Sequence, residues 1–121
     1  MDNLQFSQKL EKRTKDFAIS IIKFASKLPN FSESLILRKQ LTRSGTGIGA
    51  NYREANRSSS KAEFISKIRI CQAESSETVY WLELVNELEW TTNSYVNFLH
   101  KEAKEILAIF TSIITKLNQK K

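Results

Sequence analysis

The sequence predicts an all-α protein, an antiparallel up-down-up-down four-helix bundle. The chain of 121 residues contains only three Gly and one Pro, so it has little of the turn chemistry that many short strands would need. Apolar residues recur every three or four positions in four long blocks, which is the spacing of amphipathic helices. The connections between these blocks are short, and short connections force neighbouring helices to run antiparallel. The length and a hydrophobic content of 40% suit one soluble globular domain, 1–121.

The first two helices are predicted over about 3–28 and 33–57. Pro29 ends the first, and Ser32 is the expected N-cap of the second. The first helix places on one face Phe6, Leu10, Phe17, Ile21, Phe24 and Leu28. The second does so with Leu37, Leu41, Ser44, Ile48, Tyr52 and Ala55. At roughly 25 residues, each helix would be about 37 Å long.

The other two helices are predicted over about 61–89 and 94–118. Ser60 and Glu63 fit a capping box for the third, and residues 91–94 offer several caps for the fourth. The core line of the third helix is Phe64, Ile68, Cys71, Ser75, Thr78, Leu82 and Val85. That of the fourth is Tyr95, Leu99, Glu102, Ile106, Phe110, Ile113 and Leu117. A mean spacing of about 3.5 residues suits left-handed bundle packing.

Three glycines, Gly45, Gly47 and Gly49, resemble a phosphate-binding loop at first sight. Such loops follow a strand, open a helix and carry a Lys-Ser/Thr pair, and all three features are missing here. The glycines instead fall in the middle of the second predicted helix, where each costs on the order of 1 kcal/mol relative to Ala. We expect the close approach of a neighbouring helix to offset this cost. A local kink is the alternative.

Positive charge is concentrated in the first half of the chain. The net charge is +6, and residues 1–60 hold eleven Lys/Arg against five Asp/Glu, whereas residues 61–121 hold eight of each. The back of the second helix carries Lys39, Arg43, Arg53 and Arg57, which are candidate ligands for nucleic-acid phosphates with little sequence preference. A solvated surface and pairing with acids of another subunit are the alternatives. No aromatic residue interrupts this stripe, so base stacking is not indicated there.

The third helix carries a second candidate surface. Residues 72–90 contain no Lys or Arg but five Glu. Beside the core line lie the residues of a candidate subunit interface: Ile70, Glu74, Glu77, Trp81, Leu84 and Leu88. Such a flank is more apolar than a monomer needs, and Trp is favoured at interfaces, which favours a subunit interface; a wide core face is the alternative. Ile19 and Ile22 on the first helix also favour self-association.

Catalytic chemistry finds little support in the sequence. His100 is the only histidine and is expected to be exposed, while Cys71 lies on a core line and is expected to be a small buried hydrophobe. No Ser-His-Asp set, metal set or Glu-x-x-His pair can be assembled. We therefore expect no enzyme activity, no metal and no cofactor. No apolar window or leader pattern predicts a membrane span or secretion, so a cytoplasmic protein is expected.

Between about Leu28 and Leu88 the chain resembles a known bacterial family, the 23S rRNA-intervening sequence proteins. The resemblance is carried by Gln40-Leu41-x-Arg43-Ser44, Ile48-Gly49-Ala50-Asn51-Tyr52-Arg53-Glu54-Ala55, Ser60-Lys61-Ala62-Glu63-Phe64-Ile65-x-Lys67 and Glu74-x-x-Glu77-x-x-Tyr80-Trp81-Leu82-Glu83-Leu84. It implies a small four-helix-bundle protein, of a type sometimes encoded inside insertions in 23S rRNA genes. The family is similar to the accessory protein of diversity-generating retroelements, a basic pentameric barrel that associates with nucleic acid and a reverse transcriptase.

Two functional hypotheses follow from the residues and the resemblance together. The first is a non-enzymatic homo-oligomer, a homopentamer by resemblance, that binds RNA or DNA through its basic surface. The second is a structural adaptor whose basic stripe pairs with acidic residues of a neighbouring subunit and which binds another protein, such as a reverse transcriptase. Neither hypothesis involves a membrane.

Overall fold

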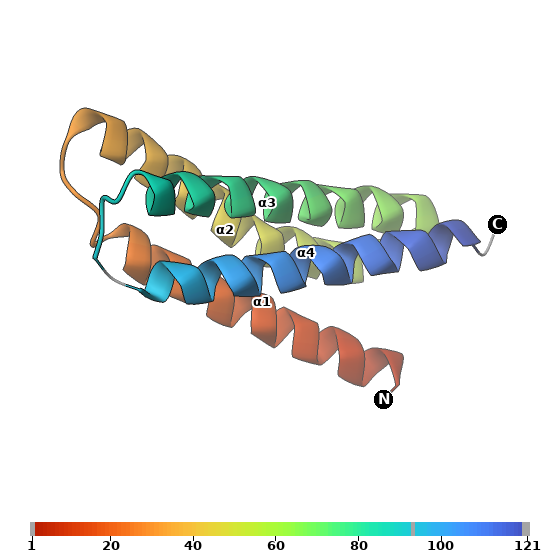
Figure 1. Cartoon of the computed structure of the whole chain (residues 1–121). Helices are drawn as coiled ribbons and strands as arrows, with labels where there is room; N and C mark the ends of the chain where they lie inside the picture. Colours follow the sequence, from red (N-terminus) through yellow and green to blue (C-terminus); the bar gives the residue numbers. More distant parts are fainter. Residues whose placement is uncertain (1, 93, 120–121) are drawn as a thin grey trace.

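The protein is a bundle of four long helices, seen in a computed structural model that describes residues 2–92 and 94–119. The helices are α1 (Asn3–Ala25), α2 (Ser32–Asn56), α3 (Lys61–Glu87) and α4 (Tyr95–Gln119), and no described residue lies in a strand. Each helix packs against the one before it and the one after it, and α4 closes the ring against α1 (Figure 1). The predicted all-helical four-helix fold is confirmed. The helix boundaries lie within three residues of the predicted ones.

Polar side chains cap the N-termini of two of the helices. The Asp2 carboxylate accepts the backbone N–H of Gln5 at 2.7 Å and so caps α1. The Ser60 hydroxyl accepts the N–H of Glu63 at 3.1 Å, as the predicted capping box requires. The Glu63 carboxylate, however, accepts from the N–H and the hydroxyl of Ser59 and not from Ser60. The cap of α3 is therefore shared by two serines.

The predicted cap of α2 is wrong. Ser32 is already the first helical residue, and the N-cap position is taken by Phe31, whose side chain makes no capping bond. The Phe31 ring instead packs edge-on against Trp90, with ring centroids 5.0 Å apart. This contact ties the start of α2 to the segment after α3. Of the expected caps of α4 at 91–94, residue 93 lies outside the described residues, and the helix begins at Tyr95.

The core follows the predicted lines closely in α2 and α3 but not everywhere else. Phe6 of α1 was expected in the core and is 41% exposed. In α4, two residues of the predicted core line lie outside the core: Tyr95 is exposed, and Glu102 binds Arg13 of α1. The buried residues of α4 are Val96, Leu99, Ala103, Ile106, Phe110 and Ile114. The buried face of α4 is therefore shifted by about one residue from the predicted face. The apolar side of this helix is wide enough for either face to be buried.

Glycines let α2 approach α1 closely. A Cβ on Gly45 would lie 2.8 Å from the Cγ2 atom of Ile21, and one on Gly49 would lie 3.1 Å from the Oγ1 atom of Thr14. The distance at Gly45 leaves no room for a Cβ unless Ile21 moves, and the distance at Gly49 is tighter than most Cβ contacts and would require Thr14 to shift by a few tenths of an ångström. The predicted packing role is confirmed, and α2 continues unbroken through all three glycines.

The ring of helices is least tightly closed between α1 and α4. This pair makes the fewest contacts of the four neighbouring pairs. Figure 1 shows α1 leaving the bundle toward its N-terminal end, which lies well away from α4. None of the helices, within the part of the chain that the structure describes, is long and apolar enough to cross a membrane.

Candidate functional site

The basic stripe of α2 lies on the outer surface of the bundle, where its side chains reach solvent. Lys39, Arg43 and Arg57 are exposed, and Arg53 is half-buried. The opposite face of the same helix is buried through residues such as Leu41, which is fully enclosed. The core line therefore fixes which way the stripe faces. Its position alone would let all four cations meet an anionic partner.

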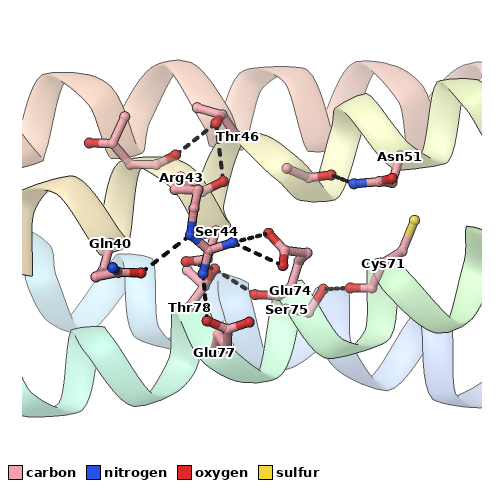
Figure 2. Close-up of polar contacts among 12 residues, drawn as sticks. Gln40, Arg43, Ser44, Thr46, Asn51, Cys71, Glu74, Ser75, Glu77 and Thr78 are labelled. Atoms are coloured by element: carbon pink, nitrogen blue, oxygen red, sulfur yellow. Dashed lines mark hydrogen bonds and ion pairs between the residues drawn. The ribbon is translucent and has the colours of Figure 1, made fainter.

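Arg43 is engaged by two carboxylates of α3. Its Nη1 donates to Glu74 at 3.3 Å and its Nη2 to Glu77 at 2.6 Å, while its Nε donates to Gln40 (Figure 2). The charge of Glu74 is the main reason that the pKa of Arg43 is raised. Because the Arg43 side chain is 51% exposed, the pairs stabilise the fold by about 1 kcal/mol at most. Locally, two negative charges face one positive charge.

Gly47 makes room for one of these carboxylates. A Cβ at this position would lie 2.5 Å from the Oε2 atom of Glu74, so only Gly allows the carboxylate to rest against the α2 backbone. The Glu74 side chain is only 13% exposed as a result. Glu74 thus joins α2 to α3 within one chain. This third glycine serves a polar contact, unlike the two that pack against α1.

Behind the ion pairs, α2 and α3 meet through small polar side chains. The hydroxyl of Thr78 lies 2.8 Å from that of Ser44, and the Ser75 hydroxyl donates to the carbonyl of Cys71 (Figure 2). The Cys71 thiol donates to the carbonyl of Ile48 at 3.6 Å. All these side chains are buried, and their hydrogen bonds offset the cost of removing them from water. The seam is structural and holds no reactive group.

The other three cations of the stripe differ in their surroundings. Arg53 lies 3.8 Å from the carboxylate of Glu11 on α1, which also accepts the amide of Asn56. Lys39 and Arg57 make no ion pair with any residue in 2–92 and 94–119. These two are the cations of the stripe whose charge is not balanced by a carboxylate in contact.

The candidate interface on α3 is divided by the structure. Glu74 and Glu77 bind Arg43 of the same chain, and Trp81 packs against the hydrophobic core. Leu84 is half-buried. Only the two ends of the set keep large exposed apolar surfaces, Ile70 at 38% and Leu88 at 48%. The alternative of a wide core face therefore describes Trp81, while Ile70 and Leu88 stay available for contact.

Residues considered for catalysis occupy structural positions. His100, expected to be exposed, is half-buried, with its Nε2 3.6 Å from a carboxylate oxygen of Glu83. Cys71 is fully buried as predicted, and burial raises the pKa of its thiol to about 12. A thiol that stays protonated at neutral pH is a poor nucleophile. No group of three His, Cys, Asp or Glu within the described residues could hold a metal ion.

Two groups of residues were missed by the sequence analysis. Arg43 pairs with two residues of α3 that lie 31 and 34 positions further along the chain, and no local spacing predicts such a contact. Tyr95 and Phe98 form a stacked, exposed pair at the start of α4. Their spacing of three residues on a predicted helix was a usable signal for this second group.

Comparison with known proteins identifies the family. A family profile described as 23S rRNA-intervening sequence protein matches residues 7–112, which is most of the chain. The chain belongs to this family. The match extends beyond the Leu28–Leu88 resemblance and reaches into α1 and α4.

A solved structure of a similar protein agrees with the fold. It is the crystal structure of a protein of unknown function from the S23 ribosomal protein family of Bacteroides thetaiotaomicron. The two chains are 36% identical and superpose with a TM-score of 0.81, over 90% of this chain and 97% of the other. A comparison with curated proteins gave no match. Family membership thus gives this chain its fold and leaves its activity to be argued from its own surface.

Proposed function

We propose that this protein is a non-enzymatic homo-oligomer, assembled as a pentamer, that binds the phosphate backbone of RNA or DNA through the outer face of α2. The observation that carries the proposal is the excess of positive charge on this face. Lys39 and Arg57 point to solvent with no carboxylate in contact among the described residues. Unbalanced cations of this kind bind phosphates and release counterions.

The four cations contribute unequally. Lys39 and Arg57 offer a full positive charge to a phosphate. Arg53 shares its charge with Glu11 at 3.8 Å. Arg43 contributes least because Glu74 and Glu77 surround it and would repel an approaching phosphate. Such contacts depend on charge and not on base identity, so the expected binding has little sequence preference.

Self-association has its own support in exposed apolar side chains. Ile19 and Ile22 of α1 are 42% and 48% exposed, and Leu35 and Ile36 of α2 are 48% and 63% exposed. Ile22 and Leu35 line one hollow between α1 and α2, and exposed aliphatic side chains of this kind favour burial against another subunit. An oligomer would also repeat the α2 face several times, which raises the affinity for a long polyanion through multiple attachment.

The salt dependence of binding tests the nucleic-acid proposal. The wild type is titrated against labelled RNA and DNA, single-stranded and duplex, between about 50 and 200 mM salt. The logarithm of the duplex binding constant should fall linearly with the logarithm of the salt concentration. The slope of this line should be about −0.9 for each phosphate contact. Lys39→Gln and Arg57→Gln should each reduce this slope by about 1.

Lys116→Gln is the matched control, because Lys116 is an exposed lysine of α4, and α4 does not contact α2. It should leave the slope unchanged. Absence of any binding at low salt would overturn the proposal. Equal effects of the α2 variants and the control would overturn the assignment to α2.

The alternative is an adaptor in which the stripe pairs with acids of a neighbouring subunit. It has less support, because Glu74 and Glu77 are already bound to Arg43 within the chain. Arg53→Glu separates the two functions when mass is measured by light scattering alongside RNA binding. Dissociation of the oligomer supports the adaptor, whereas an intact oligomer with weakened binding supports the nucleic-acid function.

A further inference from the structure

An open cleft on the bundle surface runs between α1 and α4. A cleft of about 290 Å³ lies there, lined by residues that include Lys9, Arg13 and Ser20 of α1 and Phe98 of α4. A second hollow of about 400 Å³ continues from Ser20 toward the other end of α1 and is lined by Tyr95. The cleft exists because α1 and α4 make few contacts with each other. Neither hollow includes the α2 stripe.

Two stacked aromatic rings stand at the junction of these hollows. Tyr95 and Phe98 have their ring centroids 5.2 Å apart with planes inclined by 21°. Phe98 is 57% exposed and Tyr95 is 38% exposed, so the rings form a raised platform and not part of the core. The Tyr95 hydroxyl lies 3.3 Å from the Ser20 hydroxyl, which fixes the platform against α1. An exposed ring held in place offers its face to a planar ligand at little entropic cost.

Cations line the platform on the α1 side. Lys9 lines the cleft, and Lys23 and Lys27 line the second hollow. These three lysines make no ion pair with any residue that the structure describes. From Lys9 to Lys23 the helix rises by about 21 Å, and Lys27 lies just beyond its end. A strand lying along α1 would therefore meet positive charge on both sides of the rings.

Both acidic residues that line the cleft, Asp16 and Glu102, are engaged in ion pairs. Asp16 lies 2.7 Å from Lys12, and Arg13 binds Glu102 at 2.6 Å and Glu105 at 3.0 Å. The hydrogen bonds to Glu102 are the main reason that the pKa of Arg13 is raised. Because two carboxylates match the single charge of Arg13, that arginine offers no excess positive charge, and an incoming phosphate would be held by Lys9, Lys23 and Lys27.

We propose that the α1–α4 cleft binds single-stranded nucleic acid, with an unpaired base stacked on Phe98 and flanking phosphates on Lys9, Lys23 and Lys27. Proteins that hold single strands combine aromatic platforms with a basic groove in this way. A duplex does not fit, because its bases are already stacked on one another and present no free face. An apolar peptide would leave the three lysines without a counter-charge. The proposal extends the nucleic-acid function proposed for α2 and rests on it for the class of ligand.

The test compares a single strand of about 16 nucleotides with a duplex of equal length, using fluorescence anisotropy at low salt. Phe98→Ala should weaken binding of the single strand by about 5- to 150-fold, the effect of removing one stacked base, and leave duplex binding unchanged. Phe98→Leu keeps an apolar side chain without the π face and should weaken the single strand similarly. Phe98→Trp keeps an aromatic face and should bind the single strand about as tightly as the wild type. Tyr80→Ala, which removes a similarly exposed aromatic side chain from α3, a helix that does not contact α1, should change nothing.

The outcomes separate this site from the α2 face. The stacking site is overturned if Phe98→Ala or Phe98→Leu binds the single strand as tightly as the wild type does. It is also overturned if either variant loses as much affinity for the duplex as for the single strand. If Arg57→Gln weakens the duplex in the same experiment, the α2 function survives that result. If Phe98→Ala weakens the single strand while Lys39→Gln and Arg57→Gln have no effect, the cleft stands and the α2 face fails. If the wild type binds neither probe, both proposals are overturned.

Discussion

Gly45 and Gly47 stand two residues apart on α2 but face different neighbours. Gly45 meets the buried side chain of Ile21, whose three nearest atoms would lie 2.8–3.2 Å from an added Cβ. Gly47 meets the carboxylate end of Glu74, which can rotate away into solvent. The same substitution should therefore have opposite effects at the two positions.

We expect Gly45→Ala to destabilise the protein and Gly47→Ala not to. Alanine gains about 1 kcal/mol of helix propensity at either site. At Gly45, overpacking against Ile21 should cost about 1–3 kcal/mol and outweigh this gain. At Gly47, displacement of the Glu74 carboxylate should cost about 1 kcal/mol at most, so the variant should match the wild type or exceed it slightly. Urea denaturation measures both free energies of unfolding, and a shift of both variants in the same direction would contradict the packing described.

Between elements, one arginine joins the helices that are otherwise least connected. Arg13 of α1 donates through Nε and Nη2 to both oxygens of Glu102 on α4, at 2.8 and 2.6 Å, and through Nη2 to Glu105. The paired geometry favours a well-defined contact. Arg13 therefore ties α1 to α4 across the cleft that it lines.

Arg13→Ala should loosen α1 more than it lowers global stability. The Arg13 side chain is 35% exposed, so we expect a loss of about 1 kcal/mol in the free energy of unfolding. Amide exchange in the N-terminal half of α1 should rise well above that in α3, as hydrogen exchange can measure. Lys12→Ala is the matched control, since its ion pair with Asp16 lies within α1 and is exposed. Similar exchange in the two variants would show that Arg13 does not hold α1 in place.

At the scale of the whole molecule, the buried thiol links stability to pH. In the folded bundle, burial raises the pKa of Cys71 from 9.0 to about 12. An unfolded chain therefore releases this proton at a lower pH than the folded one. The stability that this difference in pKa contributes is fully present below about pH 9 and is lost as the pH rises toward 12. Burial likewise raises the pKa of Tyr52, which adds a decrease in stability of the same sign above pH 10.

Replacing the thiol should flatten this dependence. Between about pH 9 and 11 the wild type should lose up to about 1.4 kcal/mol for each pH unit through Cys71, in addition to losses from other groups. Cys71→Ala starts from a lower stability because it leaves a small cavity, but it should lose less with rising pH. Denaturation at several pH values gives both slopes. Parallel slopes would show that the thiol of the folded protein titrates normally.

The fold and the outward direction of the charged stripe can be read from the sequence alone. Periodicity is a local property, so Leu41 and Ile48 fixed the buried face of α2, and Lys39 and Arg57 necessarily lay opposite. The helix count and boundaries followed from the same patterns and from the scarcity of Gly and Pro. Family membership was also readable from the motifs, and the profile match confirmed it.

Which charges are balanced depends on how the helices pack against one another. Whether Arg43 meets Glu74 depends on the rotation of α2 against α3, and no spacing within either helix records that rotation. The same is true of Tyr95, which periodicity placed in the core and which packing turned outward beside Phe98. Contacts between helices join residues tens of positions apart, so the pattern along one helix predicts a face but not its partner.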